Sequence, residues 1–249
     1  MIILKTAEEI EKMRKAGRVT AGMLDAVGRA VRPGITTEEL DEIAADFLRG
    51  QGAKPSFLGF EGYPKTICTS VNEEVVHGIP GPRVLREGDI VSVDAGAIVD
   101  GYQGDAARTF AVGFIDPQAQ KLIEVTEKAM YIGISQAKPG VHLGDVGYAI
   151  QQYVEAQGFG VVREYVGHGI GTEMHEDPPV PNYGRPGRGL RLRAGMCICI
   201  EPMVTAGDPA VRLLADGWTA VTQDGSWAAH FEHSLAILPE GAEILTQLT

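Results

Sequence analysis

The sequence predicts a single α+β domain in which helices pack on antiparallel β-sheet, arranged as two related halves. Three observations support this prediction. The chain has 249 residues, of which 44% are hydrophobic, so it is long enough for a large core and typical of globular proteins. Segments of helical periodicity are followed by segments of strand-like alternation, and this order occurs twice. The turn sequences between these segments also recur at a nearly constant spacing.

Two helices are expected at the start of the first half. Thr6-x-x-Glu9 is a capping-box pattern before apolar residues at near-helical spacing, and a Pro-Gly pair at residues 33–34 ends that run. A second capping box, Thr36-x-x-Glu39, begins the next helix, and Gly52 follows its last periodic residue.

The rest of the chain alternates between strand and helix patterns. Residues 84–113 indicate alternating strands with a tight turn near residues 100–101. A glycine-rich loop, GHGIGTEMHED, is expected over residues 167–177, and a polar Pro/Gly stretch follows it. The remaining elements are expected as helices over about 117–137 and 143–157, and as strands around 196–204, 218–223 and 227–238 that finish the chain.

Two short echoes relate the two halves. KPGV at residues 138–141 repeats RPGI at residues 32–35 after 106 residues. LRAG at residues 192–195 repeats LREG at residues 85–88 after 107 residues. Two echoes at nearly the same spacing indicate an internal duplication.

The duplication predicts where a site lies. We expect one domain over residues 1–249, with halves of about 1–110 and 111–249. The repeat register places Asp94 of the first half opposite Glu201 of the second. A ligand pocket is expected at the seam between the halves.

The charge balance argues against nucleic-acid binding. The net charge is −11, whereas a nucleic-acid-binding protein normally presents clustered basic residues to the phosphates. The densest basic stretch contains Arg185, Arg188, Arg191 and Arg193, and prolines and glycines interrupt it. We expect a solvated loop there, and the alternative is a contact with a partner such as an RNA surface.

The cysteines and the N-terminus indicate a cytoplasmic protein. Cys68, Cys197 and Cys199 form no C-x-x-C pair, and the last two alternate with isoleucines, so they are expected as reduced thiols in a core strand. The N-terminal apolar run is too short for a signal peptide, and no segment is apolar enough to span a membrane.

Four carboxylates follow or interrupt apolar strand patterns, two in each half. Asp94 lies in IVSVDAG, and a hairpin can bring it beside Asp105 in YQGDAARTF. Glu201 ends MCICIE, and Glu232 lies in another predicted strand. Such charges are costly unless they are paired or bound to a cation, which also relieves their repulsion. The alternative is that the aspartates cap turns and the glutamates face solvent.

Three histidines are candidates for the same site. Glycines surround His168, which frees the backbone and leaves space around the ring, so it is a candidate ligand. His175 lies in the same loop and is expected to point at the same cavity, and His77 in NEEVVHGIP is a third candidate. The alternative for each is an ordinary solvated or structural histidine.

This donor set favours a divalent-metal site. Two aspartates, two glutamates and one histidine exceed what one catalytic zinc usually takes, and they suit two ions of Co²⁺, Mn²⁺, Fe²⁺ or Zn²⁺. Such a centre hydrolyses amides or phosphate esters. The sequence has neither a GxxxxGK[ST] phosphate loop nor a GxSxG nucleophile elbow. A metallopeptidase, an aspartate-rich metallophosphoesterase and a non-enzymatic partner-binding protein remain alternatives at this point.

Longer motifs carry a resemblance to a known family. They are GYPKTICTSVNEEVVHGIPG, GDIVSVDAGAIVDGYQGDAARTF, VGHGIGTEMHE, CICIEPM and FEHSLAIL. With these motifs the chain resembles the type I methionine aminopeptidases over nearly its whole length. The resemblance implies the pita-bread fold, with two pseudo-two-fold related halves. It also implies hydrolytic removal of the initiator methionine when the second residue is small.

The resemblance also assigns the metal ligands. Asp105 and Glu232 would bridge two ions, Asp94 would bind one of them, and His168 and Glu201 would bind the other. Glu201 would also handle the proton of the attacking water.

The resemblance gives roles to the other side chains of the site. His77 would lie near the scissile nitrogen, and His175 would hydrogen-bond the substrate carbonyl and stabilise the tetrahedral oxyanion. Positions of the methionine pocket match Phe57, Phe60, Tyr63, Cys68, Met174 and Trp218. Of these, Phe57, Phe60 and Met174 differ from the family's common residues, which affects the shape of the pocket.

The subtype and partners follow in the same way. Only 30 residues separate Glu201 from Glu232, which leaves no room for the long insertion of type II relatives. The expected partners are nascent polypeptide N-termini, with transient contact to the ribosome. No sequence-specific nucleic-acid binding and no membrane association are expected, and the protein is expected to be a monomer.

Overall fold

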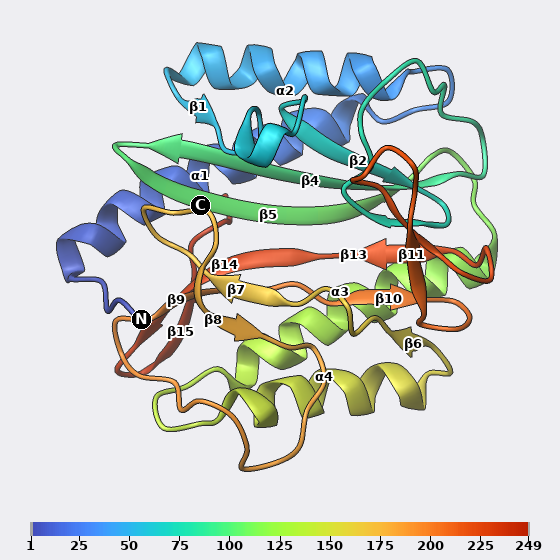
Figure 1. Ribbon diagram of the computed structural model, residues 1–249. Coiled ribbons are helices and arrows are strands. Elements are labelled where there is room, and N and C mark those ends of the chain that lie inside the picture. The colour runs from blue at the N-terminus through green and yellow to red at the C-terminus, as the bar shows by residue number, and fades with distance from the viewer. Residues whose placement is uncertain (1, 249) are drawn as a thin grey trace.

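In the computed structural model, which describes residues 2–248, helices flank an antiparallel sheet on two sides (Figure 1). In this view the first helix of the chain passes behind the long strands, the second lies above them, and two later helices lie below them. The predicted α+β class is therefore confirmed. The helices are α1 (Ala7–Ala30), α2 (Thr37–Gln51), η1 (Phe60–Gly62, a short 3₁₀ helix), α3 (Pro117–Gln136) and α4 (Leu143–Ala156).

Local sequence signals set the helix ends. Thr6 and Thr36 each accept a hydrogen bond from the third helical residue, whose glutamate side chain accepts one from the cap backbone, so both predicted capping boxes are present. Gly52 has φ 64° at the end of α2, a left-handed conformation that glycine adopts without strain. None of the helices within residues 2–248 is long and apolar enough to cross a membrane.

The main sheet joins strands from both halves of the chain. Its order is β1-β4-β5-β14-β9-β7-β8, with β2 also pairing β4 and β15 also pairing β14. The seam between the halves is the pairing of β5 with β14. The strands of this sheet are β1 (Lys54–Pro55), β2 (Ile67–Val71), β4 (Ile90–Val99), β5 (Tyr102–Ala111), β7 (Gly167–Gly169), β8 (Glu176–Val180), β9 (Cys197–Ile200), β14 (Glu232–Leu238) and β15 (Gly241–Ile244).

Two smaller sheets lie beside it. Each has three strands, in the orders β13-β10-β6 and β11-β12-β3. Their strands are β3 (Glu74–Val76), β6 (Gly160–Val161), β10 (Met203–Thr205), β11 (Val211–Leu213), β12 (Ala220–Thr222) and β13 (Ala228–His230).

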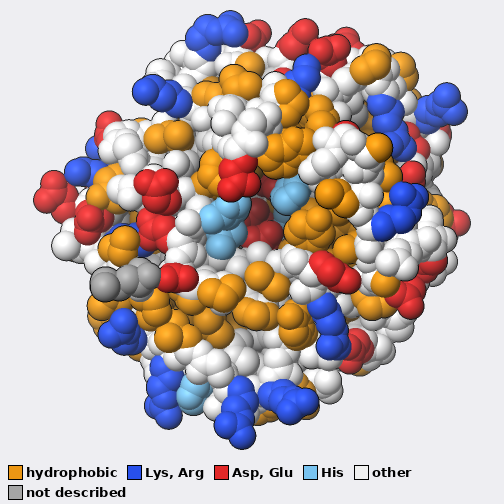
Figure 2. Space-filling view, in the orientation of Figure 1, with side chains coloured by type: hydrophobic (Ala, Val, Ile, Leu, Met, Phe, Trp, Pro, Cys, Tyr) orange, Lys and Arg blue, Asp and Glu red, His pale blue; other side chains and the backbone are white. Residues whose placement is uncertain are grey.

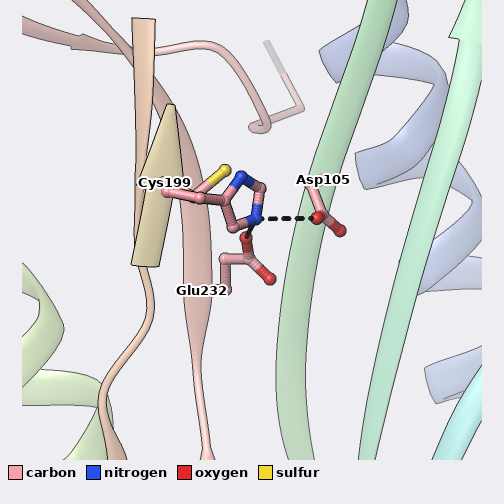
Figure 3. Close-up of side chains that lie close together, drawn as sticks. Asp105, Cys199 and Glu232 are labelled. Carbon is pink, nitrogen blue, oxygen red and sulfur yellow. Dashed lines mark ion pairs between the residues drawn. The ribbon is translucent and has the colours of Figure 1, made fainter. Parts of the chain in front are cut away.

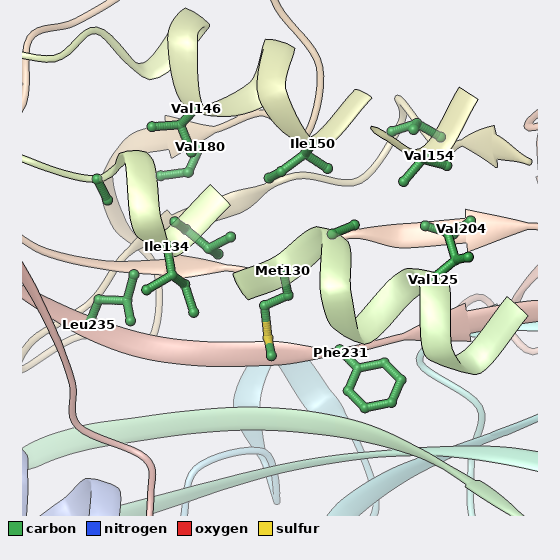
Figure 4. Close-up of a cluster of buried hydrophobic side chains, with 14 of the residues drawn as sticks. Val125, Met130, Ile134, Val146, Ile150, Val154, Val180, Val204, Phe231 and Leu235 are labelled. Carbon is green, nitrogen blue, oxygen red and sulfur yellow. The ribbon is translucent and has the colours of Figure 1, made fainter. Parts of the chain in front are cut away.

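Separate hydrophobic clusters fill the spaces under the two helix pairs. In the second half, Val146, Ile150 and Val154 lie four residues apart on one face of α4 and are buried. They belong to one cluster with Met130 of α3 and Val204 of β10, which Figure 4 also labels. A second cluster, around α1, α2 and the β4–β5 hairpin, fills the first half.

Several strands differ from the sequence-based prediction. β2 was missed because all five of its residues are buried, so its sequence shows no alternation of exposed and buried positions. The segment predicted as a glycine-rich loop instead begins and ends in paired strands, β7 and β8. β15 follows the last predicted strand, so residues 227–238 do not finish the sheet.

Close packing of α1 on β5 gives a testable consequence. A Cβ at Gly104 would lie 2.8 Å from backbone atoms of Ala16 and Gly17, and the Thr20 hydroxyl donates to the Gly104 carbonyl at 3.0 Å. Gly104→Ala is expected to lower the free energy of unfolding by about 1–3 kcal/mol in urea titrations. Gly50→Ala on α2 has open space and is expected to stabilise by up to about 1 kcal/mol. Equal effects of the two substitutions would contradict this packing.

Candidate metal centre

Neighbouring strands place two of the predicted carboxylates together. Asp94 on β4 pairs with Ala107 of β5, and Asp105 lies two residues before Ala107, so the two aspartates are diagonal neighbours on one face. Asp105 is buried. Burial, and then the negative charge of Asp105, raise the pKa of Asp94 well above its usual range. The predicted hairpin therefore does bring these two side chains together.

The seam adds the carboxylates of the second half. Glu232, the first residue of β14, also pairs with Ala107, so Ala107 lies between Asp94 and Glu232 on three adjacent strands. Glu201 follows β9, whose Ile200 pairs with His233 of β14. Burial, and then the charge of Asp105, raise the pKa of Glu232 well above its usual range. Figure 3 shows Asp105 and Glu232 converging from different strands on one small space.

His168 on β7 completes the predicted set of donors. Its Nε2 lies 3.6 Å from Asp105 Oδ2, 3.5 Å from Glu201 Oε1 and 3.9 Å from Glu232 Oε1. Its Nδ1 lies 2.9 Å from the Gly169 carbonyl oxygen, which orients the ring with Nε2 toward the carboxylates. Burial lowers the pKa of His168, but the hydrogen bond to Asp105 and the charge of Glu201 outweigh it and raise the pKa to about 8.

These residues fit divalent metal ions. Each of the four carboxylates has one buried oxygen with no hydrogen-bond partner among the described residues: Asp94 Oδ1, Asp105 Oδ1, Glu201 Oε1 and Glu232 Oε1. Four carboxylates around one space repel one another, and a cation relieves both the repulsion and the missing contacts. Oxygen ligands with one imidazole suit hard or borderline divalent ions.

Two residues of the centre were not predicted as ligands. Donor atoms of Asp105, His168, Cys199 and Glu232 all lie within 4.8 Å of one another, as do those of Glu201, His230 and Glu232. His230 is 1% exposed, and its Nε2 lies 3.5 Å from Glu201 Oε2. The sequence signal that could have identified His230 is its position two residues before the predicted ligand Glu232, in the segment HFEH. Cys199 is a buried free thiol, as predicted, but it also borders the ligand group.

The two other predicted histidines line the cavity above the donors. This cavity has a volume of about 580 Å³ and contains all five predicted ligands as well as His77 and His175. The ring of His175 lies 4.4 Å from that of His168, edge to face. Burial lowers the pKa of both His77 and His175, which favours neutral rings. His77 has φ 61°, an uncommon conformation for a non-glycine residue and one that recurs at functional sites.

An apolar cluster forms one wall of the same cavity. Tyr63 and Trp218 meet edge to face with ring centroids 5.0 Å apart, and the Tyr63 hydroxyl donates to the carbonyls of Ile67 and Gly78. The structure thus brings the six predicted pocket residues together. They are Phe57, Phe60, Tyr63, Cys68, Met174 and Trp218.

A buried ion pair fixes the segment that carries Met174 and His175. Lys5 Nζ donates to Glu176 Oε2, and these side chains are only 4% and 7% exposed. The other oxygen of Glu176 accepts from the Glu173 backbone at 3.3 Å. Through this ion pair, the N-terminal segment that carries Lys5 fixes the position of Glu176, which directly follows His175.

Lys5→Met is expected to lower the free energy of unfolding by about 3–5 kcal/mol, because it leaves the Glu176 carboxylate buried without its partner. The double variant Lys5→Met/Glu176→Met is expected to recover much of this loss in denaturant titrations. Lys65→Met, which breaks a more exposed pair with Glu38, serves as control and is expected to cost less than about 1 kcal/mol. A loss no larger than that of the control would contradict the anchoring role.

Comparisons with known proteins agree with this site. Residues 11–239 match the metallopeptidase family M24. The chain is 57% identical to a methionine aminopeptidase of Clostridium acetobutylicum, with 99% of each chain covered, and 54% identical to methionine aminopeptidase 1 of Bacillus subtilis, with 100% of each chain covered.

Solved structures show the same fold. The crystal structure of methionine aminopeptidase from Thermotoga maritima superposes with a TM-score of 0.98 at 51% identity, over 100% of both chains. The enzyme from Rickettsia prowazekii gives 0.97 at 44% identity, over 99% of this chain and 100% of that one. The predicted pita-bread fold is thereby confirmed. The chain belongs to metallopeptidase family M24 and, within it, to the methionine aminopeptidases.

Proposed function

We propose that this protein is a metal-dependent aminopeptidase that removes the initiator methionine from nascent polypeptides whose second residue is small. The observation that carries the proposal is the arrangement of four carboxylates and one imidazole in a cavity with an apolar wall. The high identity to proteins named methionine aminopeptidase supports the same activity.

Asp94, Asp105, His168, Glu201 and Glu232 would hold two divalent ions, of Co²⁺, Mn²⁺, Fe²⁺ or Zn²⁺. Bound ions of this kind lower the pKa of water toward neutrality and so supply a nucleophile for hydrolysis. Within the protein, Asp105 and Glu232 lie between Asp94 on one side and His168 on the other, so both carboxylates would help to hold the ions together with these neighbours.

The apolar cluster would bind the methionine side chain. Tyr63 and Trp218 offer flat aromatic surfaces, and Met174 and Cys68 add polarizable sulfur, which adapts to a thioether. Because the Tyr63 hydroxyl is hydrogen-bonded to backbone carbonyls, Tyr63 would contact the substrate only through its ring. The pocket therefore favours an unbranched apolar side chain over a charged one.

The remaining residues would handle protons and the developing charge. The Glu201 carboxylate would take the proton of the attacking water. A neutral His175 ring would donate a hydrogen bond to the substrate carbonyl oxygen as it becomes negative, and His77 would lie beside the scissile nitrogen. Cleavage of the peptide bond then yields free methionine and a new α-amino group.

A peptide series tests this proposal. With Mn²⁺ present, Met-Ala-Ser should release methionine, whereas Lys-Ala-Ser should remain intact because a buried ammonium ion has no partner in the apolar pocket. Met-Trp-Ser should be cleaved much more slowly than Met-Ala-Ser. Equal cleavage of all three peptides, measured by chromatography, would contradict the assigned specificity.

The setting of the reaction is also proposed here. We propose a cytoplasmic enzyme, and the three free, buried cysteines fit a reducing compartment. A monomeric state, encounter with nascent chains and transient contact with the ribosome belong to the same proposal. Neither membrane association nor sequence-specific nucleic-acid binding is part of the proposal.

A further inference from the structure

A second concave surface lies next to the catalytic cavity. It is a groove of about 400 Å³ whose apolar lining includes Leu143, Pro178, Pro181 and Leu190. Pro179 lines both this groove and the catalytic cavity, so the two are adjacent. Figure 2 shows apolar side chains below the central hollow, and basic side chains beyond them at the lower edge of the same face.

Strand β8 connects the cavity to the groove. It begins directly after His175 and ends one residue before Pro181, at the edge of the main sheet. Pro178 and Pro179 have no backbone N–H, so this edge resists the addition of a further strand. At about 3.3 Å per residue, five residues of strand span about 17 Å. An extended ligand that follows β8 from the metal centre therefore enters the groove at Pro178 and Pro179 and reaches the arginines beyond the end of the strand after about five residues.

Four exposed arginines lie on the segment that follows β8, and two of them line the groove. Arg185 and Arg188 line it directly, and Arg191 and Arg193 follow. Among residues 2–248, no carboxylate lies within 4.0 Å of these four guanidinium groups, and residues 178–200 contain no Asp or Glu. Of the ten other arginines, six pair with carboxylates among the described residues: Arg14, Arg18, Arg29, Arg49, Arg83 and Arg163. A local positive surface on a chain of net charge −11 favours an acidic partner.

The backbone that carries these arginines is held in place. The Gly187 N–H donates to Asp145 Oδ1 at 2.7 Å, and the Gly144 N–H donates to the Arg188 carbonyl at 2.9 Å. The Asp145 carboxylate also accepts from the His142 backbone, so it is already used to fix this loop on α4. Arg185 and Arg188 are therefore presented on a preorganised backbone, which lowers the entropic cost of binding.

We propose that the groove binds the part of the polypeptide substrate that lies about five or more residues after the cleaved methionine, with Arg185 and Arg188 favouring acidic side chains there. The inference rests on the proposed function. The groove has an apolar lining and is connected to the cavity along β8, and both features favour a peptide over a nucleic acid. The phosphates of a nucleic acid would contact only the arginines and leave the apolar lining unused.

The test compares peptides that differ only at positions 5–7. Met-Ala-Ser-Gly-Glu-Glu-Glu-Gly is expected to show a kcat/KM about three- to ten-fold higher than the same peptide with three lysines, and 0.5 M NaCl should reduce this ratio. Arg185→Ser/Arg188→Ser should bring the ratio close to one. Arg32→Ser/Arg86→Ser removes the same charge from exposed positions of the first half and should leave the ratio unchanged.

The tripeptide Met-Ala-Ser separates the possible failures, because it is too short to reach the arginines of the groove. Equal hydrolysis of Met-Ala-Ser by all three proteins, together with loss of the ratio only in Arg185→Ser/Arg188→Ser, supports the inference. Hydrolysis of Met-Ala-Ser with a ratio of one in the wild type overturns it but leaves the proposed function intact. No hydrolysis of Met-Ala-Ser overturns both. An unchanged ratio in Arg185→Ser/Arg188→Ser, with weaker binding of a short single-stranded RNA, would make this surface a nucleic-acid contact instead.

Discussion

Asp105→Ala is expected to abolish metal binding and methionine release together, with kcat/KM for Met-Ala-Ser reduced by about 10³-fold or more. Asp105 lies between the carboxylates of both halves and within 3.6 Å of His168, so no other side chain replaces its oxygens. A metal centre contributes several kcal/mol of transition-state stabilisation, and each 1.36 kcal/mol corresponds to about ten-fold in rate. Metal content by mass spectrometry and peptide hydrolysis measure the two losses.

The stability of the metal-free protein separates a ligand from a structural residue. Asp105 adds to the repulsion among buried carboxylates, so metal-free Asp105→Ala should unfold at the same or a higher temperature than metal-free wild type. The Asp105 backbone N–H donates to the Ser234 hydroxyl, and this hydroxyl donates to the Asp105 carbonyl. Neither bond involves the Asp105 side chain, so both remain in the variant. Asp46→Ala, on the exposed face of α2, is the matched control and should retain metal and activity. A destabilised Asp105→Ala that still binds two ions would contradict the ligand role.

His175→Ala is expected to lower kcat by about 10²–10³-fold while metal content stays the same. His175 lies next to His168 but outside both groups of ligand atoms, and its neutral ring suits a hydrogen-bond donor to a developing oxyanion. Removal of one such donor typically costs about 2.7–4 kcal/mol of transition-state stabilisation.

A conservative variant sharpens this second prediction. His175→Asn keeps a side-chain N–H donor and should recover part of the lost kcat, with KM for Met-Ala-Ser little changed. The substitutions change the contact between the His175 ring and the Phe60 ring, whose centroids are 5.3 Å apart, so the fold of both variants is checked by circular dichroism. We expect the fold to be retained in both. Parallel losses of metal and kcat in His175→Ala would show that this histidine holds the metal centre rather than the substrate.

Local signals were sufficient to predict much of the fold. Capping boxes at Thr6 and Thr36 placed two helices, and the turn near residues 100–101 placed Asp94 and Asp105 on one hairpin. These features depend on contacts between residues close in the chain, which periodicity and turn chemistry record.

Other features depend on contacts between distant segments, which a single sequence does not reveal. The pairing of β5 with β14 brings Glu232 beside Asp105 although the two residues lie 127 positions apart in the chain. The Lys5–Glu176 pair, whose members are 171 residues apart, could not be predicted either. His230 was overlooked although the predicted strand 227–238 contains both His230 and Glu232, because a single sequence does not show that these two side chains approach Glu201.

The central claim is that the five-residue cluster holds divalent metal ions that hydrolyse methionyl peptides. The most direct measurement is methionine release from Met-Ala-Ser by protein reconstituted with Mn²⁺, before and after addition of a chelator, and after metal is restored. We predict that release stops with the chelator and returns with the metal. Release that persists in metal-free protein, or two bound ions without any release, would contradict the claim.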